Sequence, residues 1–207
     1  MNLKKIIPKI VGLIIILSGA TVAGFAIAFE LAETPVFSLP LLDLEVVSGV
    51  QVFHDNRSTQ LHIGFDFRLE NNTKIYAPIA GIITQVKKHQ MSNGYWLIDV
   101  NIKINAKWTM FIAFEPWTTE ESVIDNQLLF ITVSRGDSVE LNQSLGILTP
   151  VPESEFPHIH WTITSNTFMG KKEHESPYDY CSIEAQNQLW ELCQSFGKIP
   201  EDSLSLL

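Results

Sequence analysis

The feature that most constrains the fold is a succession of short strand-like runs between residues 44 and 165. The runs are rich in Val, Ile, Phe, Tyr and Trp, and turn signals such as Ser92–Gly94 and Arg135–Asp137 separate them. Many short strands without intervening helices are typical of antiparallel β folds. We therefore expect a mainly β chain with an antiparallel β-sheet or barrel-like core. The expected strands are Val46–Phe53, Leu61–Arg68, Lys74–Ala77, Gly81–Lys87, Tyr95–Ile104, Trp108–Phe114, Leu128–Val133, Gly146–Thr149 and His158–Thr164.

After Pro177 the pattern changes to that of a helix. Apolar residues between Ile183 and Phe196 recur at spacings of three and four, which predicts a short C-terminal helix on the outside of the sheet. The two cysteines are Cys181 and Cys193. If both belong to this helix, about 18 Å of rise separates them, whereas bridged cysteines need Cα atoms within about 7 Å. We expect two free, partly buried thiols.

The N-terminal thirty residues differ from the rest. Three lysines among the first nine residues are followed by twenty uncharged residues, 10–29. Twenty helical residues span a hydrocarbon core of about 30 Å, and the basic flank is expected to stay in the cytoplasm. Ala26 and Ala28 form an A-x-A cleavage pattern, so a secretory signal peptide is the rival to a membrane anchor with an N-terminal hydrophobic helix. Both interpretations place the rest of the chain outside the cytoplasm, either anchored to the membrane or secreted.

The length of 207 residues suits one domain with short additions. Pro35, Pro40 and a scarcity of charge indicate a linker or an extended arm after the hydrophobic segment. The predicted parts are the anchor or signal peptide at 1–30, the linker at 31–44, the β domain at 45–170 and a C-terminal helical extension at 171–207.

The charge balance narrows the possible partners. Without the three N-terminal lysines, 11 basic residues face 23 acidic ones, which gives the exported part a net charge of −12. Nucleic-acid binding rewards clustered Lys and Arg, so this acidic surface argues against it. It also offers no electrostatic attraction to anionic cell-wall polymers.

Two clusters carry residues that can bind a metal. His62 and Asp66 are four residues apart in Leu61–Phe67, so a straight strand would hold them about 13 Å apart. Zinc bonds are only about 2.0–2.2 Å long, so one ion can take both side chains only if the chain bends between them. Gly64 is the residue that permits such a bend. Alone, this pair is more often a surface histidine and a turn aspartate.

The second cluster is Phe156–Trp161, which contains His158 and His160. In a strand these two histidines share a face about 6.6 Å apart, so one can bind a metal while the other faces a bound water. Three protein ligands with an open fourth position are the arrangement of a catalytic zinc site. Such an ion activates water for attack on an amide, and a neighbouring imidazole can move the proton.

The order of four motifs resembles the lysostaphin and LytM-type zinc metallopeptidases. Their opening H-x-G-x-D matches His62, Gly64 and Asp66, and their closing H-x-H matches His158 and His160. Between these lie two further stretches with the family pattern, Thr73–Ile83, which contains Tyr-Ala-Pro, and Gly136–Gly146, which begins Gly-Asp-Ser-Val. The resemblance covers roughly residues 50–165.

This resemblance implies a fold, a site and an activity. His62, Asp66 and His160 would be the ligands of a Zn²⁺ ion, and His158 would be a catalytic histidine beside it. The fold would be an antiparallel β metallopeptidase core with the site in a groove. The reaction would be hydrolysis of peptide bonds in peptidoglycan stems or cross-bridges, which makes envelope peptides the expected partner.

The sequence departs from the family in two places. The family has a second catalytic histidine in a motif like Y-A-H-L, and the matching stretch Ile112–Glu115 places Phe114 in its position. Phenylalanine can neither donate a hydrogen bond nor move a proton, and losing one transition-state donor typically costs about 10²–10³ in rate. The stretch 115–135 is also longer than the family needs and acidic, which suggests either a loop beside the groove that alters substrate choice or a solvated loop.

Two functional hypotheses follow. The first is a zinc endopeptidase of the cell envelope, possessing the full ligand set but weakened at Phe114. The alternative is a catalytically inactive module that retains zinc and binds wall peptides or regulates a partner hydrolase. A phosphocarrier of the sugar phosphotransferase type is disfavoured, because its Ala-Pro stretch precedes the histidine motif, whereas Ala77 and Pro78 follow His62.

Overall fold

The structure is a computed structural model that describes residues 24, 26, 29, 31–55, 61–70, 72–151, 154–166, 170 and 172–200. The hydrophobic segment predicted at 1–30 lies almost wholly outside these residues. Within the part of the chain that is described, no helix has both the length and the apolar character needed to cross a membrane. The choice between anchor and signal peptide therefore stays a prediction.

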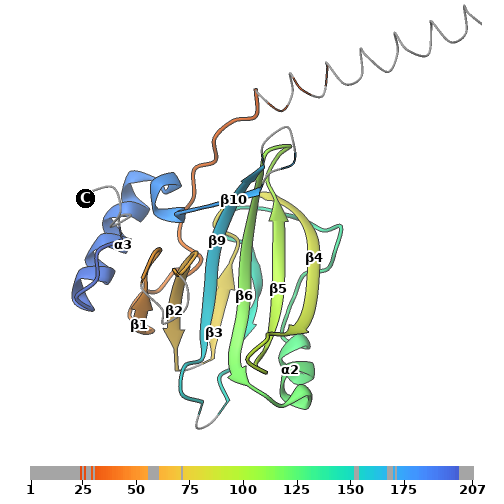
Figure 1. Ribbon diagram of the computed structural model, residues 1–207, viewed down its shortest axis with the longest axis vertical. Coiled ribbons are helices and arrows are strands. Elements are labelled where there is room, and N and C mark those ends of the chain that lie inside the picture. Colours follow the sequence, from red (N-terminus) through yellow and green to blue (C-terminus); the bar gives the residue numbers. More distant parts are fainter. Residues whose placement is uncertain are drawn as a thin grey trace, which may run out of the picture.

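The predicted fold class is confirmed, because the described chain is mainly antiparallel β (Figure 1). An eight-stranded sheet has the order β1-β2-β9-β6-β5-β4-β7, with β10 also paired to β9, and a separate pair joins β3 to β8. The main sheet curves but stays open between its edge strands β1 and β7 rather than closing into a barrel. The strands are β1 (Val47–Gln51), β2 (Phe65–Leu69), β3 (Thr73–Tyr76), β4 (Gly81–Gln90), β5 (Trp96–Lys103), β6 (Trp108–Thr118), β7 (Ser138–Val139), β8 (Ser144–Leu148), β9 (His158–Asn166) and β10 (Lys172–Glu175).

Strand alternation separates the core from the opposite face of the sheet. On β6 and β9, the side chains of Ile112, Phe114, Ile159 and Trp161 are fully buried and belong to one apolar cluster. The β3–β8 pair adds its own buried residues to this cluster and lies behind β9 and β6 in Figure 1. Because successive side chains of a strand point to opposite faces, the residues between these apolar ones face away from the core.

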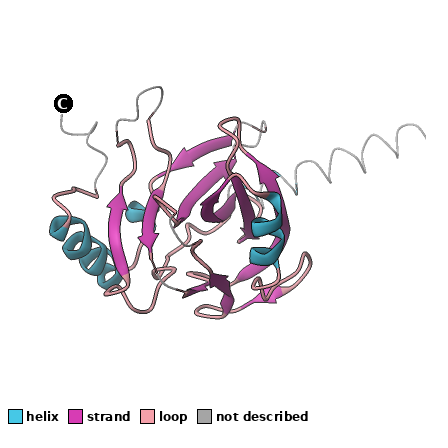
Figure 2. Ribbon diagram, turned by 90° about the horizontal axis from the view of Figure 1, so that it is seen from below, coloured by secondary structure: helices cyan, strands magenta, loops and turns pink. Residues whose placement is uncertain are grey.

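The helices lie at the margins of the sheet. They are α2 (Glu121–Leu128), the 3-10 turn η1 (Pro177–Tyr180) and α3 (Ile183–Ser195), and Figure 2 shows α2 and α3 on opposite sides of the molecule. The predicted C-terminal helix is confirmed as α3, whose N-terminus is capped by the Ser182 side chain. Cys181 and Cys193 are both free and buried, as expected, and burial raises the pKa of each thiol to about 12.

The segment 31–44 has the form of an extended arm that packs onto the domain. Phe37, Leu39 and Leu41 are buried in the common core. The Phe37 amide donates to the Tyr180 carbonyl at 2.8 Å, and the Tyr76 amide donates to the carbonyl of Pro40 at 2.9 Å. The arm therefore joins the C-terminal extension to the β3 strand.

The predicted strand at 128–133 is wrong. The α2 helix ends at Leu128, and consecutive turn hydrogen bonds carry the chain to Ile131, which makes only an isolated bridge to Gly146. The apolar run Leu128–Phe130 suggested a strand, but these three side chains are exposed and do not alternate between a buried and an exposed face. Turn hydrogen bonds satisfy the amides of residues 129–131, and pairing with β8 is limited to the two hydrogen bonds that flank the Ile131–Gly146 bridge.

Gln127 anchors α2 to strand β8 and to the residue that follows it. This contact can be tested by mutation. Its buried amide donates to the Ile147 carbonyl at 2.7 Å and accepts from the Thr149 amide at 2.8 Å. Gln127→Ala should lower the free energy of unfolding by about 1–3 kcal/mol, because both backbone groups lose their partner. Urea denaturation measures this, with the exposed Asn126→Ala as the matched control. Equal stability of the two variants would contradict the anchoring role.

Candidate metal centre

Asp66 and His160 lie side by side on the neighbouring strands β2 and β9. They are directly opposed in the antiparallel register, and both point away from the core that holds Phe65, Phe67 and Trp161. The same alternation that buries these aromatic residues therefore brings the carboxylate and the imidazole together on the other face.

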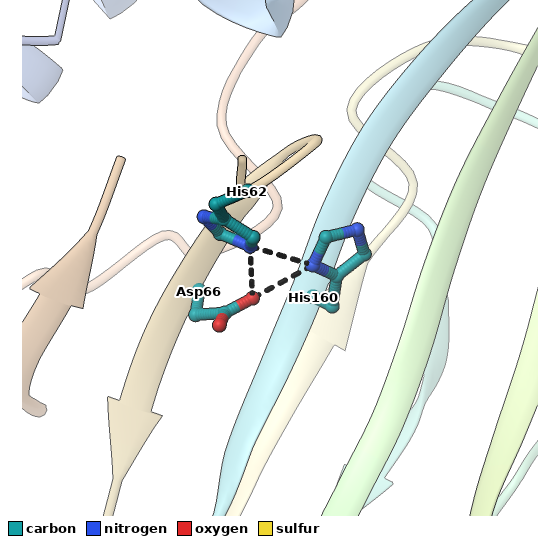
Figure 3. Close-up of side chains that lie close together, drawn as sticks. All are labelled: His62, Asp66 and His160. Atoms are coloured by element: carbon teal, nitrogen blue, oxygen red, sulfur yellow. Dashed lines mark hydrogen bonds and ion pairs between the residues drawn. The ribbon is translucent and has the colours of Figure 1, made fainter. Parts of the chain in front are cut away.

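His62 reaches the same point because the chain bends before β2. The strand begins only at Phe65, so the predicted strand from Leu61 is too long by four residues, and Gly64 forms a bend. The bend that the sequence required between His62 and Asp66 is therefore present. Figure 3 shows the side chains of Asp66 on β2, His160 on β9 and His62 just before β2 converging on one point.

The ligand atoms of these three residues form a compact group. His62 Nε2 is 3.0 Å from Asp66 Oδ1 and 3.1 Å from His160 Nδ1, and His160 Nδ1 is 2.7 Å from the same Asp66 oxygen. All lie within 4.8 Å of one another, which suits one metal ion. Two imidazoles and one carboxylate are a donor set that zinc accepts, so the residues fit the ion that the motifs imply.

The backbone behind His62 sets the direction of its ring. Nδ1 donates to the Val52 carbonyl at 2.9 Å, which leaves the lone pair of Nε2 directed at the other two ligand atoms. Metal-binding histidines are commonly oriented by such a hydrogen bond from the second nitrogen. The Asp55 carboxylate accepts from the Val52 amide at 3.2 Å and from Lys198 Nζ at 2.7 Å. The C-terminal extension therefore supports the His62 side of the site.

Gly64 has a second role that the sequence analysis missed. A Cβ at this position would lie 2.6 Å from His160 Cε1 and 2.6 Å from the Trp161 carbonyl oxygen. Both distances are shorter than real carbon contacts. The His160 ring therefore rests directly on the Gly64 backbone, and only glycine leaves room for it.

The charges around Asp66 favour its ionised form. Burial raises the pKa of this carboxyl group, but the nearby His158 and the close contacts with His160 and His62 outweigh burial and hold the pKa well below its ordinary value. Asp66 is therefore a carboxylate at neutral pH. A buried anion facing imidazole nitrogens is an environment suited to a cation.

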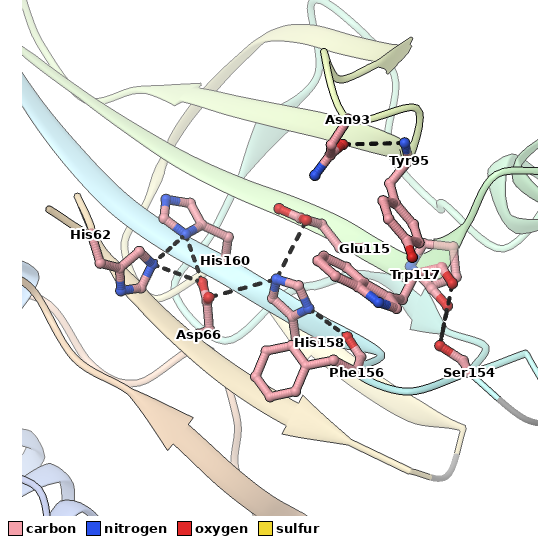
Figure 4. Close-up of polar contacts among 11 residues, drawn as sticks. His62, Asp66, Asn93, Tyr95, Glu115, Trp117, Ser154, Phe156, His158 and His160 are labelled. Atoms are coloured by element: carbon pink, nitrogen blue, oxygen red, sulfur yellow. Dashed lines mark hydrogen bonds and ion pairs between the residues drawn. The ribbon is translucent and has the colours of Figure 1, made fainter. Parts of the chain in front are cut away.

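His158 lies next to the three predicted ligands but is not one of the group. Its Nδ1 donates to the Phe156 carbonyl at 2.7 Å, and its Nε2 lies 3.7 Å from Asp66 Oδ2 and 3.3 Å from Glu115 Oε2 (Figure 4). The structure thus brings all four predicted site residues together. It adds Glu115 as a fifth polar group that the sequence analysis did not assign to the site.

The predicted position of Phe114 in the site is wrong by one residue. Phe114 is fully buried and pairs with Ile98 and Ile159 on the core face of the sheet. Glu115 is instead the β6 residue that pairs with His158 and faces the site. The motif alignment placed position 114 beside the metal, but strand alternation places position 115 there.

A pocket of about 450 Å³ opens onto the candidate metal site. Its far side is aromatic, since Trp117 stacks on Tyr95 with ring centroids 4.3 Å apart and lies 5.5 Å from the His158 ring. Trp117 has a φ of 61°, a left-handed conformation that is unusual for a bulky residue and that costs conformational free energy. The pocket is lined by Gln51, Leu61, His62, Ile63, Asp66, Met91, Asn93, Glu115, Trp117, Phe156, His158 and His160.

The remaining polar candidates lie outside this pocket. His54, His89 and His174, which the sequence left open as substitutes for a catalytic histidine, do not line it. Of the acidic residues in 115–135, only Glu115 does, while Glu121 and Asp125 on α2 are paired with Lys88. The acidic stretch therefore contributes one residue to the site.

No family model matches the chain, and no curated protein does. The solved structures that it resembles include the catalytic domain of the prophage-encoded M23 protein EnpA from Enterococcus faecalis, at 19% identity and a TM-score of 0.45, covering 70% of this chain and 94% of that one. Lysostaphin from Staphylococcus simulans matches at 18% identity and a TM-score of 0.46, covering 66% of this chain and 50% of that one. The SpoIIQ–SpoIIIAH pore forming complex matches at 16% identity and a TM-score of 0.47, covering 75% of this chain and 98% of that one.

Lysostaphin-type M23 peptidases are thus among the similar structures, as the motifs suggested, at low sequence identity.

Proposed function

We propose that the chain is a zinc-dependent endopeptidase of the cell envelope that hydrolyses peptide bonds of peptidoglycan. The observation that carries this proposal is the convergence of His62, Asp66 and His160 at the wall of a pocket large enough for a peptide segment. Three ligands facing an open pocket fit a catalytic centre better than a closed structural one. The substrate class comes from the motif resemblance, and the extracytoplasmic location comes from the segment 10–29, which is also the proposed membrane contact.

Each residue of the site has a part in this proposal. His62, Asp66 and His160 would hold the ion, which when bound polarises a carbonyl and lowers the pKa of water to about 7. His158 would make its catalytic hydrogen bond through Nε2, since its Nδ1 donates to the Phe156 carbonyl. Trp117 and Phe156 form an apolar wall that would orient the peptide and exclude water.

A metal analysis combined with a hydrolysis assay tests the proposal. The full chain, purified in detergent because of residues 10–29, should bind one zinc ion and release peptides from purified peptidoglycan. Loss of a group that supports a zinc ligand typically costs about 10–100-fold in zinc affinity. His160→Ala removes a predicted ligand itself, so it should lower zinc affinity by more than this, and peptide release should stop. His174→Ala removes an exposed histidine outside the pocket and serves as the matched control. A wild-type chain without stoichiometric metal would overturn the proposal.

The alternative function is a zinc-retaining module that binds wall peptides without cleaving them. The observation that favours it is Glu115, because β6 presents a carboxylate rather than an imidazole to His158. Under this alternative the wild-type chain would bind zinc and peptidoglycan fragments but release no peptide. The same assay therefore separates the two functions.

A further inference from the structure

We propose that Glu115 is the catalytic proton acceptor of this site, a role that rests on the proposed peptidase function. Glu115 ends a row of polar groups that runs from the candidate metal site through Asp66 and His158. Its side chain lines the same pocket as the three predicted ligands, yet the residue is only 7% exposed. Figure 4 shows its carboxylate directed at the His158 ring.

The other titratable side chains of the pocket contact one another. His62, Asp66 and His160 direct their ligand atoms at one another. His158 has one nitrogen bound to a backbone carbonyl, and its other nitrogen lies between two carboxylates. Two carboxylate oxygens therefore already contact this second nitrogen, and the His158 side chain is 4% exposed against 9% for Glu115.

Glu115 meets the geometric requirement of a general base. A general base must reach the reacting water directly or through one other water, and Glu115 shares the pocket wall with the ligands. The charged groups that face it are His158 from β9, Asp66 beyond that ring and Asp99 from β5. The imidazole lies 3.3 Å from one carboxylate oxygen and sets the direction of the Glu115 side chain.

The proposed step conserves atoms and charge. One O–H bond of the attacking water breaks, and its proton moves to a Glu115 carboxylate oxygen while the water oxygen bonds to the carbonyl carbon of the substrate. The C–N bond then breaks, and the leaving nitrogen takes the proton from Glu115. The carboxylate is regenerated, and no oxidant or reductant is needed.

Three substitutions in the full chain test the role. Glu115→Gln keeps the shape of the side chain but cannot accept the proton. Glu115→His replaces the carboxylate by another proton acceptor. Glu191→Gln changes an exposed glutamate on α3 and is the matched control. For each variant we would measure zinc affinity, the dissociation constant of a peptidoglycan stem peptide, and the kcat and KM of hydrolysis per zinc-loaded chain.

The expected result separates chemistry from binding. Glu115→Gln should keep zinc and peptide affinity but lose about 100-fold or more in kcat with KM unchanged, because general-base catalysis contributes about 10²–10⁴. Glu115→His should retain more of the wild-type kcat than Glu115→Gln does. If Glu115→Gln does not fold, the kcat of Glu115→His still tests whether position 115 needs a proton acceptor.

Three results would overturn the proposal, and they differ from one another. A kcat for Glu115→Gln within about threefold of wild type rejects the proton role alone. Loss of zinc from this variant with zinc kept by Glu191→Gln makes Glu115 a ligand instead. A zinc-loaded wild type that binds the stem peptide without cleaving it rejects the peptidase function and the proton role with it.

Discussion

Phe114→His is expected to destabilise the domain by about 3–5 kcal/mol without adding any hydrolytic activity. Position 114 is fully buried between Ile98 and Ile159 on the core face of the sheet. The substitution removes an aromatic side chain from a packed core and buries imidazole nitrogens that have no partner there. From the motif alignment alone, the same substitution would be expected to restore a catalytic histidine.

Chemical denaturation and the peptide-release assay together decide between these expectations. Phe111→His, on the same strand but on the opposite and partly exposed face, is the matched control and should cost much less. A stable Phe114→His variant with raised activity would mean that position 114 faces the pocket, and our assignment of the two faces of β6 would then be incorrect.

Gly64→Ala is expected to remove zinc binding, although Gly64 is not itself a predicted zinc ligand. The added methyl group would lie 2.6 Å from both His160 Cε1 and the Trp161 carbonyl oxygen. Trp161 lies in β9, which is paired on both sides, so its backbone has little freedom to retreat. The His160 ring must therefore rotate away from the other ligands, and overpacking adds about 1–3 kcal/mol of destabilisation.

A competition titration with a zinc chelator measures the change in zinc affinity. We expect a loss of at least about 100-fold, which is the upper end of the range observed when the groups that orient a ligand are mutated. Gly49→Ala is a close control, because its Cβ would meet only Arg68 side-chain atoms at ordinary contact distances of 3.5 Å or more. If Gly64→Ala binds zinc as tightly as Gly49→Ala does, the close packing of His160 on Gly64 does not shape the site.

The sequence was sufficient to predict which residues meet at the candidate metal site. Its motifs pointed to His62, Asp66 and His160, and simple strand geometry required a bend at Gly64 before one ion could reach both His62 and Asp66. The structure brings these residues together, while their role as ligands remains a prediction. The close approach of the His160 ring to Gly64 was out of reach, because it depends on how β2 and β9 are paired.

The error at Phe114 had a signal in the sequence. Trp108, Met110, Ile112 and Phe114 alternate as the apolar positions of one strand, and a residue in phase with that alternation belongs to the core. Glu115 is out of phase and therefore faces the site. The motif alignment outweighed this alternation, although the alternation reports directly on the direction of a side chain.

Contacts between distant segments could not be predicted. The sequence between Leu31 and Leu44 looks like a linker because it is short, rich in proline and almost uncharged. Only the folded sheet provides the surface that buries Phe37 and Leu39. The left-handed conformation of Trp117 could not be predicted either, since no local pattern predicts a positive φ for tryptophan.

The buried arm also limits how far the pocket can lie from the membrane. The Asn105 side chain binds the carbonyl of Glu33, so the arm is attached to the domain from about that residue onward. If residues 10–29 remain in a bilayer, only residues 30–33 are left as a tether, and four residues span at most about 14 Å. The domain would then sit against the outer surface of the membrane and act on the nearest layer of wall material, whereas cleavage after Ala28 would release it from that restriction.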